Sequence, residues 1–290
     1  MPRIFLQVPE GLKTKVFEIA DELGEDVIIS GETCFGACDI KPDEAKRAGC
    51  EKIVHYGHTK FLESDMPVEY KEIREKIDVV PVLESNIEMI KDYERIGVVT
   101  TLQFLDVLAD VKNYLESKGK KMILGKGQKT VYDGQVLGCD PYAGVSIKDD
   151  VDCFIYIGSG KFHPLGLLLK TEKPVFGLDI ERNEMKSIDE FKDKFLRQKY
   201  AAIGMVKDAK RFGILVSSKP GQMNMDLAEK IKGKLRSEGK KAWILIFDEV
   251  KPEKLEFLDL DAYVNTACPR IAIEDRTAFK KPIVNPDELP

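Results

Sequence analysis

The chain contains the same succession of strands and helices three times, and this internal repeat limits the folds that it can adopt. Each copy opens with an apolar strand and an amphipathic helix that ends at a glycine. A basic residue follows the third strand of each copy, and a proline leads the fourth. The recurring residues are Gly24, Gly119 and Gly239, then Lys60, Lys161 and Arg270, then Pro67, Pro174 and Pro282. The same landmarks in the same order indicate a repeat architecture.

Strands that alternate with helices predict parallel sheets covered by helices. We expect an α/β fold of three repeated units, each a small four-stranded parallel sheet flanked by helices, in a pseudo-threefold arrangement. The predicted units are 1–90, 91–205 and 206–290, with boundaries in the polar, charged segments near 84–94 and 181–210. The predicted strands are 4–8, 27–29, 53–56 and 67–70, then 96–99, 122–124, 154–157 and 174–176, then 212–216, 243–246, 262–264 and 282–284.

The periodicity of apolar residues predicts one long helix in each unit. The first predicted helix carries Val16, Ile19, Ala20 and Leu23, the second carries Leu105, Leu108, Val111 and Leu115, and the third carries Met223, Leu227, Ile231 and Leu235. A shorter helix is predicted over 42–49, where Pro42 suits the first turn.

Charge and hydropathy argue against two classes of partner, nucleic acids and membranes. The formal net charge of −5 argues against a nucleic-acid binder with a basic face. The sequence contains neither an apolar run of about 18 residues that could span a membrane nor the core of a signal peptide. We therefore expect a cytoplasmic protein that binds neither membranes nor nucleic acid. With 6 cysteines in 290 residues and a reducing compartment, the thiols are expected to be buried, catalytic or bound to metal.

Three cysteines, one from each unit, follow predicted strands. Cys38 and Cys139 come after the second strand of their units and each precedes an aspartate, whereas Cys268 comes after a third strand. Ligands of open α/β sheets bind at the carboxyl ends of strands. Three thiolates brought together there would suit an iron–sulfur cluster, and the lack of a fourth protein ligand would leave one iron open to substrate.

The other cysteines and the histidines have competing interpretations. Cys34 is an alternative to Cys38 as the first ligand, and we favour Cys38 because it shares the Cys-Asp placement with Cys139. Cys50 and Cys153 are expected in the core, and His55 is expected to pack within a strand. His58 and His163 are placed in loops after the third strands, where they either face the proposed centre or are solvated.

Basic residues and one polar turn are candidates for binding the rest of a substrate. Lys60, Lys161 and Arg270 could hold a carboxylate, or they could be solvated residues of ordinary loops. The turn 217–222 precedes a predicted helix and could accept an anion, although it lacks the phosphate-loop pattern. We take Lys219, Gln222, Arg270 and His163 as the candidate substrate- or cofactor-binding residues, and no catalytic residue is assigned beyond the cysteines.

These motifs resemble those of the radical diphthamide synthase family over essentially the whole chain. The stretches that carry the resemblance are GETCFGACD at 31–39, GQVLGCDP at 134–141, VNTACPR at 264–270 and SSKPGQ at 217–222. The resemblance implies a 4Fe-4S cluster held by Cys38, Cys139 and Cys268, with S-adenosylmethionine bound as substrate at the open iron.

The resemblance also implies an activity. Family members are transferases that perform the first step of diphthamide biosynthesis by a noncanonical radical mechanism. They move the 3-amino-3-carboxypropyl group of S-adenosylmethionine to a histidine of translation elongation factor 2 and release methylthioadenosine. The implied partners are elongation factor 2, an electron donor and, as in archaeal members, a second copy of the chain in a homodimer.

Two other functions remain open from the sequence. A quinolinate synthase-like enzyme also has three repeated units and three cysteines on one 4Fe-4S cluster, which acts there as a Lewis acid. A non-catalytic subunit on the same fold is the second alternative, although the presence of all three candidate ligands argues against it. The simplest alternative is an α/β protein with buried cysteines and no metal.

Overall fold

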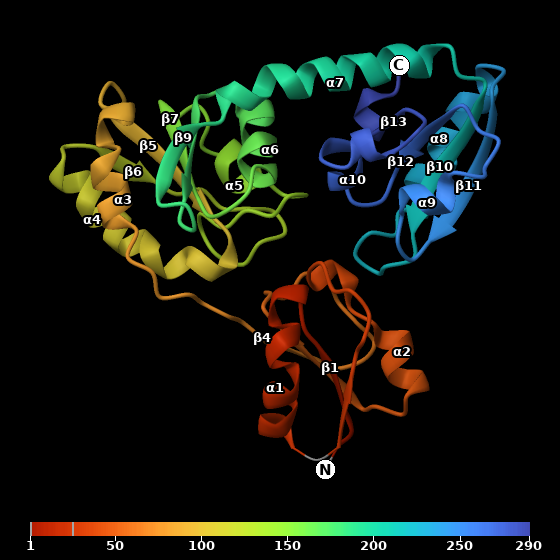
Figure 1. The fold of residues 1–290 in the computed structure, drawn as a ribbon, viewed down its shortest axis with the longest axis horizontal. Coiled ribbons are helices and arrows are strands. Elements are labelled where there is room, and N and C mark those ends of the chain that lie inside the picture. The colour runs from red at the N-terminus through yellow and green to blue at the C-terminus, as the bar shows by residue number, and fades with distance from the viewer. Residues whose placement is uncertain (1, 25) are drawn as a thin grey trace. The chain divides into compact units, whose positions relative to one another are not determined.

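Three separate sheets make up the framework of the protein (Figure 1). The structure is a computed structural model and describes residues 2–24 and 26–290. The chain divides into two compact units, residues 1–188 with two of the sheets and residues 189–290 with the third.

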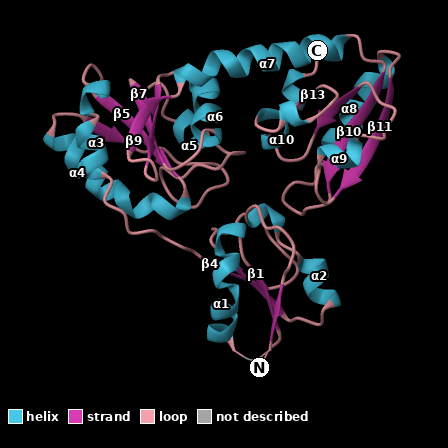
Figure 2. Ribbon diagram, viewed as in Figure 1, coloured by secondary structure: helices cyan, strands magenta, loops and turns pink. Residues whose placement is uncertain are grey.

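The first sheet contains four parallel strands in the order β2-β1-β3-β4. The strands are β1 (Ile4–Gln7), β2 (Val27–Ile29), β3 (Lys52–Tyr56) and β4 (Val68–Lys71). Helix α1 (Val16–Leu23) covers one face and α2 (Pro42–Arg47) the other (Figure 2). Leu6 packs in the cluster that includes residues of α1, and Phe5 in the cluster that includes Ala45 of α2. Successive side chains of a strand point to opposite faces, which explains this division. Short 3₁₀ segments η1 (Glu10–Lys15) and η2 (Ala37–Asp39) complete this part.

The second sheet has the strand order β6-β5-β7-β8-β9. The strands are β5 (Arg95–Thr100), β6 (Lys121–Ile123), β7 (Cys153–Ile157), β8 (Val175–Asp179) and β9 (Glu184–Ser187). The helical segments are α3 (Val80–Ser85), η3 (Ile87–Ile90), η4 (Leu102–Val107), α4 (Leu108–Ser117), α5 (Tyr142–Val145) and α6 (Phe162–Thr171). Leu105 falls in η4, before the α-helix that its spacing predicted.

The prediction of four parallel strands is wrong for this sheet, because β9 is a fifth strand and runs antiparallel to β8. Only residues 180–183 separate the two strands, and Asn183 adopts a left-handed φ of 53°. A connection this short closes an antiparallel pair but cannot make the crossover that a parallel strand needs.

The third sheet, in residues 189–290, has the order β11-β10-β12-β13 and is entirely parallel. The strands are β10 (Arg211–Ser217), β11 (Lys241–Phe247), β12 (Ala262–Asn265) and β13 (Ile283–Val284). The helical segments are α7 (Asp189–Lys207), α8 (Met225–Ser237), α9 (Pro252–Leu255), α10 (Arg270–Ile273), η5 (Arg276–Ala278) and η6 (Pro286–Glu288). The predicted place of Met223 in a helix is wrong, because the Asn224 side chain caps α8 by accepting the Leu227 N–H at 3.1 Å.

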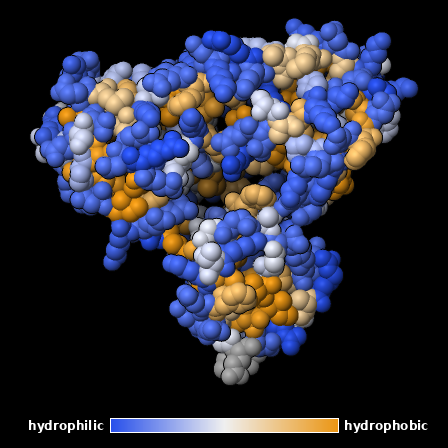
Figure 3. Space-filling model, in the orientation of Figure 1, coloured by the Kyte–Doolittle hydropathy of each residue, from blue (hydrophilic) through white to orange (hydrophobic). Residues whose placement is uncertain are grey.

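The same strand order therefore recurs in the three sheets: the first strand of each copy is central and is flanked by the second and the third. Every predicted strand is present, and β9, α6 and α7 are the major additions. Hydrophilic residues cover most of the face drawn in Figure 3, with apolar patches between them. Within residues 2–24 and 26–290, no helix combines the length and apolar character that crossing a membrane requires.

Candidate active site

Cys38 lies in η2, above the carboxyl end of β1. The side chain of Gln7, the last residue of β1, is buried, and its Nε2 donates to the backbone oxygen of Asp39 at 2.6 Å. The adjacent Cys38 is partly exposed, whereas Asp39 is fully buried and its carboxylate lies 3.4 Å from Nζ of Lys41. Gln7 therefore anchors the segment that presents the Cys38 thiol.

Cys139 is exposed at the tip of a tight turn. Leu137 and Asp140 exchange two backbone hydrogen bonds of 3.0 and 2.9 Å, which places Gly138 and Cys139 between them. Thr100, the last residue of β5, binds the preceding loop: its N–H donates to the oxygen of residue 134 and its oxygen accepts the N–H of residue 136, both at 2.8 Å. Cys139 is thus held close to the carboxyl end of the central strand of its sheet.

Asp140 orders the loop around Cys139. Its side chain is 4% exposed, and its carboxylate accepts N–H groups from Gln128 at 2.9 Å, Lys129 at 2.5 Å and Tyr142 at 3.0 Å. The aspartates that follow Cys38 and Cys139 are both buried, and Asp140 holds its loop by accepting backbone N–H groups, a role that the sequence did not predict.

The turn of Cys139 packs directly against the start of α6. A Cβ atom on Gly138 would lie 1.6 Å from the ring of Phe162, so only glycine permits this approach. The next residue, His163, stacks on Tyr156 with ring centroids 5.7 Å apart, and its Nδ1 lies 3.4 Å from the Tyr156 hydroxyl. The loop position predicted for His163 is wrong, since His163 is the second residue of α6. A polar side chain is nevertheless held near Cys139.

Cys268 follows β12 in the other compact unit and is partly exposed. Asn265, the last residue of β12, donates from Nδ2 to the Cys268 backbone oxygen at 2.9 Å. The backbone N–H and the hydroxyl of Thr266 both donate to the oxygen of Leu215 in β10 at 2.9 Å. As in the other two sheets, the segment with the cysteine is tied to the carboxyl end of the central strand.

The remaining predicted binding residues of this unit lie in ordered segments. Lys219 is 3% exposed, and its backbone N–H donates to Ser217 Oγ at 3.2 Å. The N–H of Gln222 donates to the Lys219 oxygen at 2.9 Å, which closes the turn. Arg270 opens α10, is exposed, and pairs through Nε with Glu274 at 2.5 Å.

Cys50 and Cys153 belong to the core, as predicted, with exposures of 7% and 0%. Burial raises the pKa of both thiols, to about 12 for Cys153. Neither is suited to bind a metal as a thiolate without rearrangement.

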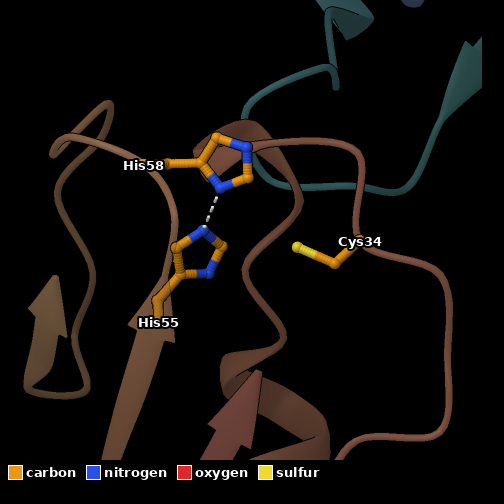
Figure 4. Close-up of side chains that lie close together, drawn as sticks. All are labelled: Cys34, His55 and His58. Atoms are coloured by element: carbon orange, nitrogen blue, oxygen red, sulfur yellow. Dashed lines mark hydrogen bonds between the residues drawn. The ribbon is translucent and has the colours of Figure 1, made fainter. Parts of the chain in front are cut away.

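Sequence reasoning missed a group formed by Cys34, His55 and His58 (Figure 4). Each residue offers one ligand atom, and these atoms lie within 4.8 Å of one another. His55 Nε2 and His58 Nδ1 are 2.9 Å apart, and burial lowers the pKa of His55 to about 3 and of His58 to about 4. The packed position predicted for His55 is confirmed. The available signal was a pair of histidines three residues apart, His55 in the predicted strand and His58 in the loop after it.

The donor set suits an iron–sulfur cluster. Cys38, Cys139 and Cys268 are partly or fully exposed in loops at carboxyl strand ends, whereas Cys34, Cys50 and Cys153 are buried. Thiolates are the usual protein ligands of such clusters. Cys38 and Cys139 belong to residues 1–188 and Cys268 to residues 189–290, so a cluster shared by all three stays a prediction.

Comparisons with known proteins identify relatives of the chain. Residues 8–290 match the family model of diphthamide synthesis proteins. The chain is 36% identical over 293 residues to the 2-(3-amino-3-carboxypropyl)histidine synthase of Pyrococcus horikoshii, with 99% of this chain and 84% of that protein covered. It is 29% identical over 309 residues to the synthase of the same name from Methanocaldococcus jannaschii, with 99% and 83% covered.

A solved structure is similar over the same extent. The crystal structure of Dph2 from Pyrococcus horikoshii with a 4Fe-4S cluster matches with a TM-score of 0.91 at 35% identity, and the match covers 99% of this chain and 84% of that chain. The sequence and structural matches span nearly every residue, and the chain therefore belongs to the family of diphthamide synthesis proteins.

Proposed function

We propose that this chain is a 2-(3-amino-3-carboxypropyl)histidine synthase, the transferase of the first step of diphthamide biosynthesis. The observation that carries the proposal is the 36% identity, over 99% of the chain, to a protein of that name. Three accessible thiols, each held at the carboxyl end of a central strand, support it independently. The donated group would come from S-adenosylmethionine, and the acceptor would be a histidine of translation elongation factor 2.

Cys38, Cys139 and Cys268 are the residues that we propose to hold a 4Fe-4S cluster. When bound, the cluster supplies the electron for reductive cleavage of a carbon–sulfur bond in S-adenosylmethionine. The chain holds each thiol in a hydrogen-bonded loop. Gln7, Asp140 and Asn265 bind the backbone beside each thiol, and such outer contacts fix the direction of metal ligands.

The substrate would be held by residues around these thiols. Arg270 carries a guanidinium that suits the methionine carboxylate, although it must share its charge with Glu274. The turn that contains Lys219 and Gln222 presents backbone groups for a polar ligand. His163, stacked on Tyr156 beside the Cys139 turn, is the candidate from the other compact unit.

The resemblance to the diphthamide synthase family also leads us to propose an assembly. The repeat units 1–90, 91–205 and 206–290 would face one another in a pseudo-threefold arrangement so that one cysteine of each reaches a common point. An electron donor and a second copy of the chain in a homodimer would complete the enzyme. The site would need an entrance open to solvent, because its acceptor is a histidine on a large protein substrate.

A product assay with matched cysteine variants tests the proposal. Anaerobically reconstituted protein, reduced in the presence of S-adenosylmethionine and elongation factor 2, should release methylthioadenosine and modify the factor. Cys38→Ala, Cys139→Ala and Cys268→Ala should each lose iron, acid-labile sulfide and activity. Cys50→Ala removes a buried thiol outside the site and should retain all three. A reconstituted protein that contains no cluster, or that forms quinolinate instead, would refute the proposal.

A further inference from the structure

Cys34, His55 and His58 form a donor group distinct from the three thiols proposed for the cluster. Cys34 comes from the loop after β2, His55 from the end of β3 and His58 from the loop that follows (Figure 4). Cys34 is 2% exposed and His55 is fully buried. Burial of polar groups such as a thiol and two imidazoles costs free energy unless the groups are paired.

The backbone fixes the two histidines relative to each other. Gly57, between Tyr56 at the end of β3 and His58, has a left-handed φ of 84°, and a Cβ atom there would lie 3.1 Å from Pro9. This turn returns the chain so that His58 Nδ1 reaches His55 Nε2 at 2.9 Å. The pair is therefore built by a local turn that glycine alone fits without strain.

One nitrogen of the pair lacks a partner. Among the residues that the structure describes, Nδ1 of His55 is buried without a hydrogen bond, and so is Oε1 of Gln7. Gln7 and His55 are register partners on neighbouring parallel strands, so their side chains lie on the same face of the sheet. A ring that binds metal through Nε2 carries its proton on Nδ1, where an amide oxygen is a typical acceptor.

We propose that Cys34, His55 and His58 bind one divalent cation of the zinc class. A thiolate with two imidazoles is a donor set that zinc favours, and three protein ligands leave a fourth position for water or a nearby group. Tetrahedral zinc with bonds of about 2.0–2.1 Å to nitrogen separates two such ligands by roughly 3.3 Å. The observed 2.9 Å between the imidazole nitrogens needs to open only slightly.

The proposed cation site lies next to the segment that contains Cys38. Its test therefore requires a chain from which the three cluster thiols have been removed. A Cβ atom on Gly36 would lie 3.7 Å from Cys38 Sγ and 4.0 Å from His58 Nε2. We therefore choose the tag-free chain of residues 1–290 with Cys38→Ser, Cys139→Ser and Cys268→Ser. Failure of cluster assembly or of transferase activity cannot then affect the result.

Cobalt is the probe, since it occupies zinc sites and reports its ligands by absorption. Under anaerobic conditions, this background should bind one equivalent of Co²⁺ with the intense visible bands of tetrahedral coordination and a near-ultraviolet thiolate-to-cobalt band. Zinc should displace the cobalt and raise the melting temperature. Absence of the thiolate band would overturn the proposal.

Matched variants assign the ligands. Cys34→Ala should abolish the thiolate band, and His58→Ala should weaken cobalt binding by more than about 100-fold, beyond the loss expected for an outer-shell residue. Two control variants should leave the spectrum unchanged. Cys50→Ala removes the other buried thiol beside this sheet, and His163→Ala removes the remaining histidine. Circular dichroism of each metal-free variant checks the fold, and His58→Gln replaces His58→Ala if that variant is unfolded. Retention of the thiolate band in Cys34→Ala, or its loss in Cys50→Ala, would contradict the assignment.

Discussion

Asp152 clamps Arg95 through both its backbone and its side chain. Oδ2 of Asp152 accepts the Arg95 backbone N–H at 2.8 Å, while Oδ1 accepts Nη2 at 2.6 Å and Nε at 3.2 Å. Asp261 repeats these contacts with Arg211, at 2.8 Å to the backbone N–H, 2.9 Å to Nη2 and 3.3 Å to Nε. Each arginine opens a central strand and each aspartate immediately precedes the third strand of its copy, so the clamps close the amino ends of the sheets.

The Asp152–Arg95 and Asp261–Arg211 contacts make the free energy of unfolding depend on pH. Hydrogen bonds from Arg95 and Arg211 lower the pKa of Asp152 and of Asp261 to about 2. Because the unfolded carboxyls titrate near 4, the stabilisation is present above about pH 4 and is lost as the pH falls towards 2. Asp152→Asn and Asp261→Asn should each lower the free energy of unfolding by about 1 kcal/mol at neutral pH, a value reduced for solvent screening. Urea unfolding at several pH values measures this, and a difference from the parent protein that stays constant down to pH 2 would contradict it.

Gly138→Ala should disturb the presentation of Cys139 while the sheet remains folded. The new methyl group would overlap the ring of Phe162, with a 1.6 Å approach, so the turn or α6 must move at a cost of about 1–3 kcal/mol. We expect a lower melting temperature and loss of cluster from reconstituted protein. Gly166→Ala is the control: a Cβ atom at this position in α6 would meet nothing within 4 Å, so this variant should keep both. Equal cluster content in the two variants would show that the turn does not position Cys139.

Gln7→Leu should loosen the segment of Cys38. The substitution removes the 2.6 Å hydrogen bond to the Asp39 oxygen and leaves that buried carbonyl without its donor, which costs about 1–3 kcal/mol. We expect a lower melting temperature together with weaker retention of iron during dialysis against a chelator. A variant that loses stability yet retains iron like the parent protein would limit Gln7 to a role in packing.

Thiol reactivity should follow burial. In metal-free folded protein, iodoacetamide should label the exposed Cys139 first and should leave Cys50 and Cys153 unmodified, because burial raises the pKa of both. Peptide mass spectrometry with and without urea measures the order. Labelling of native Cys153 at the rate of Cys139 would contradict the buried position of β7.

The sequence predicted the strands and the cysteine loops well, because those signals are local. Apolar runs, helix-ending glycines and proline-led strands recur in register, and they identified every strand of the three parallel arrangements. The motifs around Cys38, Cys139 and Cys268 predicted their positions after strands. The fifth strand, β9, escaped prediction since its polar sequence, EMKS, pairs only through its neighbour β8.

The sequence by itself thus determined the repeat, the order of its elements and the residue types offered at the strand ends. The tertiary structure alone decided which groups meet. Asp152 and Arg95 are separated by 57 residues and Gln7 and Asp39 by 32, and no spacing rule relates such pairs. Cys34 likewise reaches His55 and His58 only because parallel pairing brings the carboxyl ends of β2, β1 and β3 to one edge. Contacts between strands depend on packing over long sequence distances, which local patterns of hydropathy do not encode.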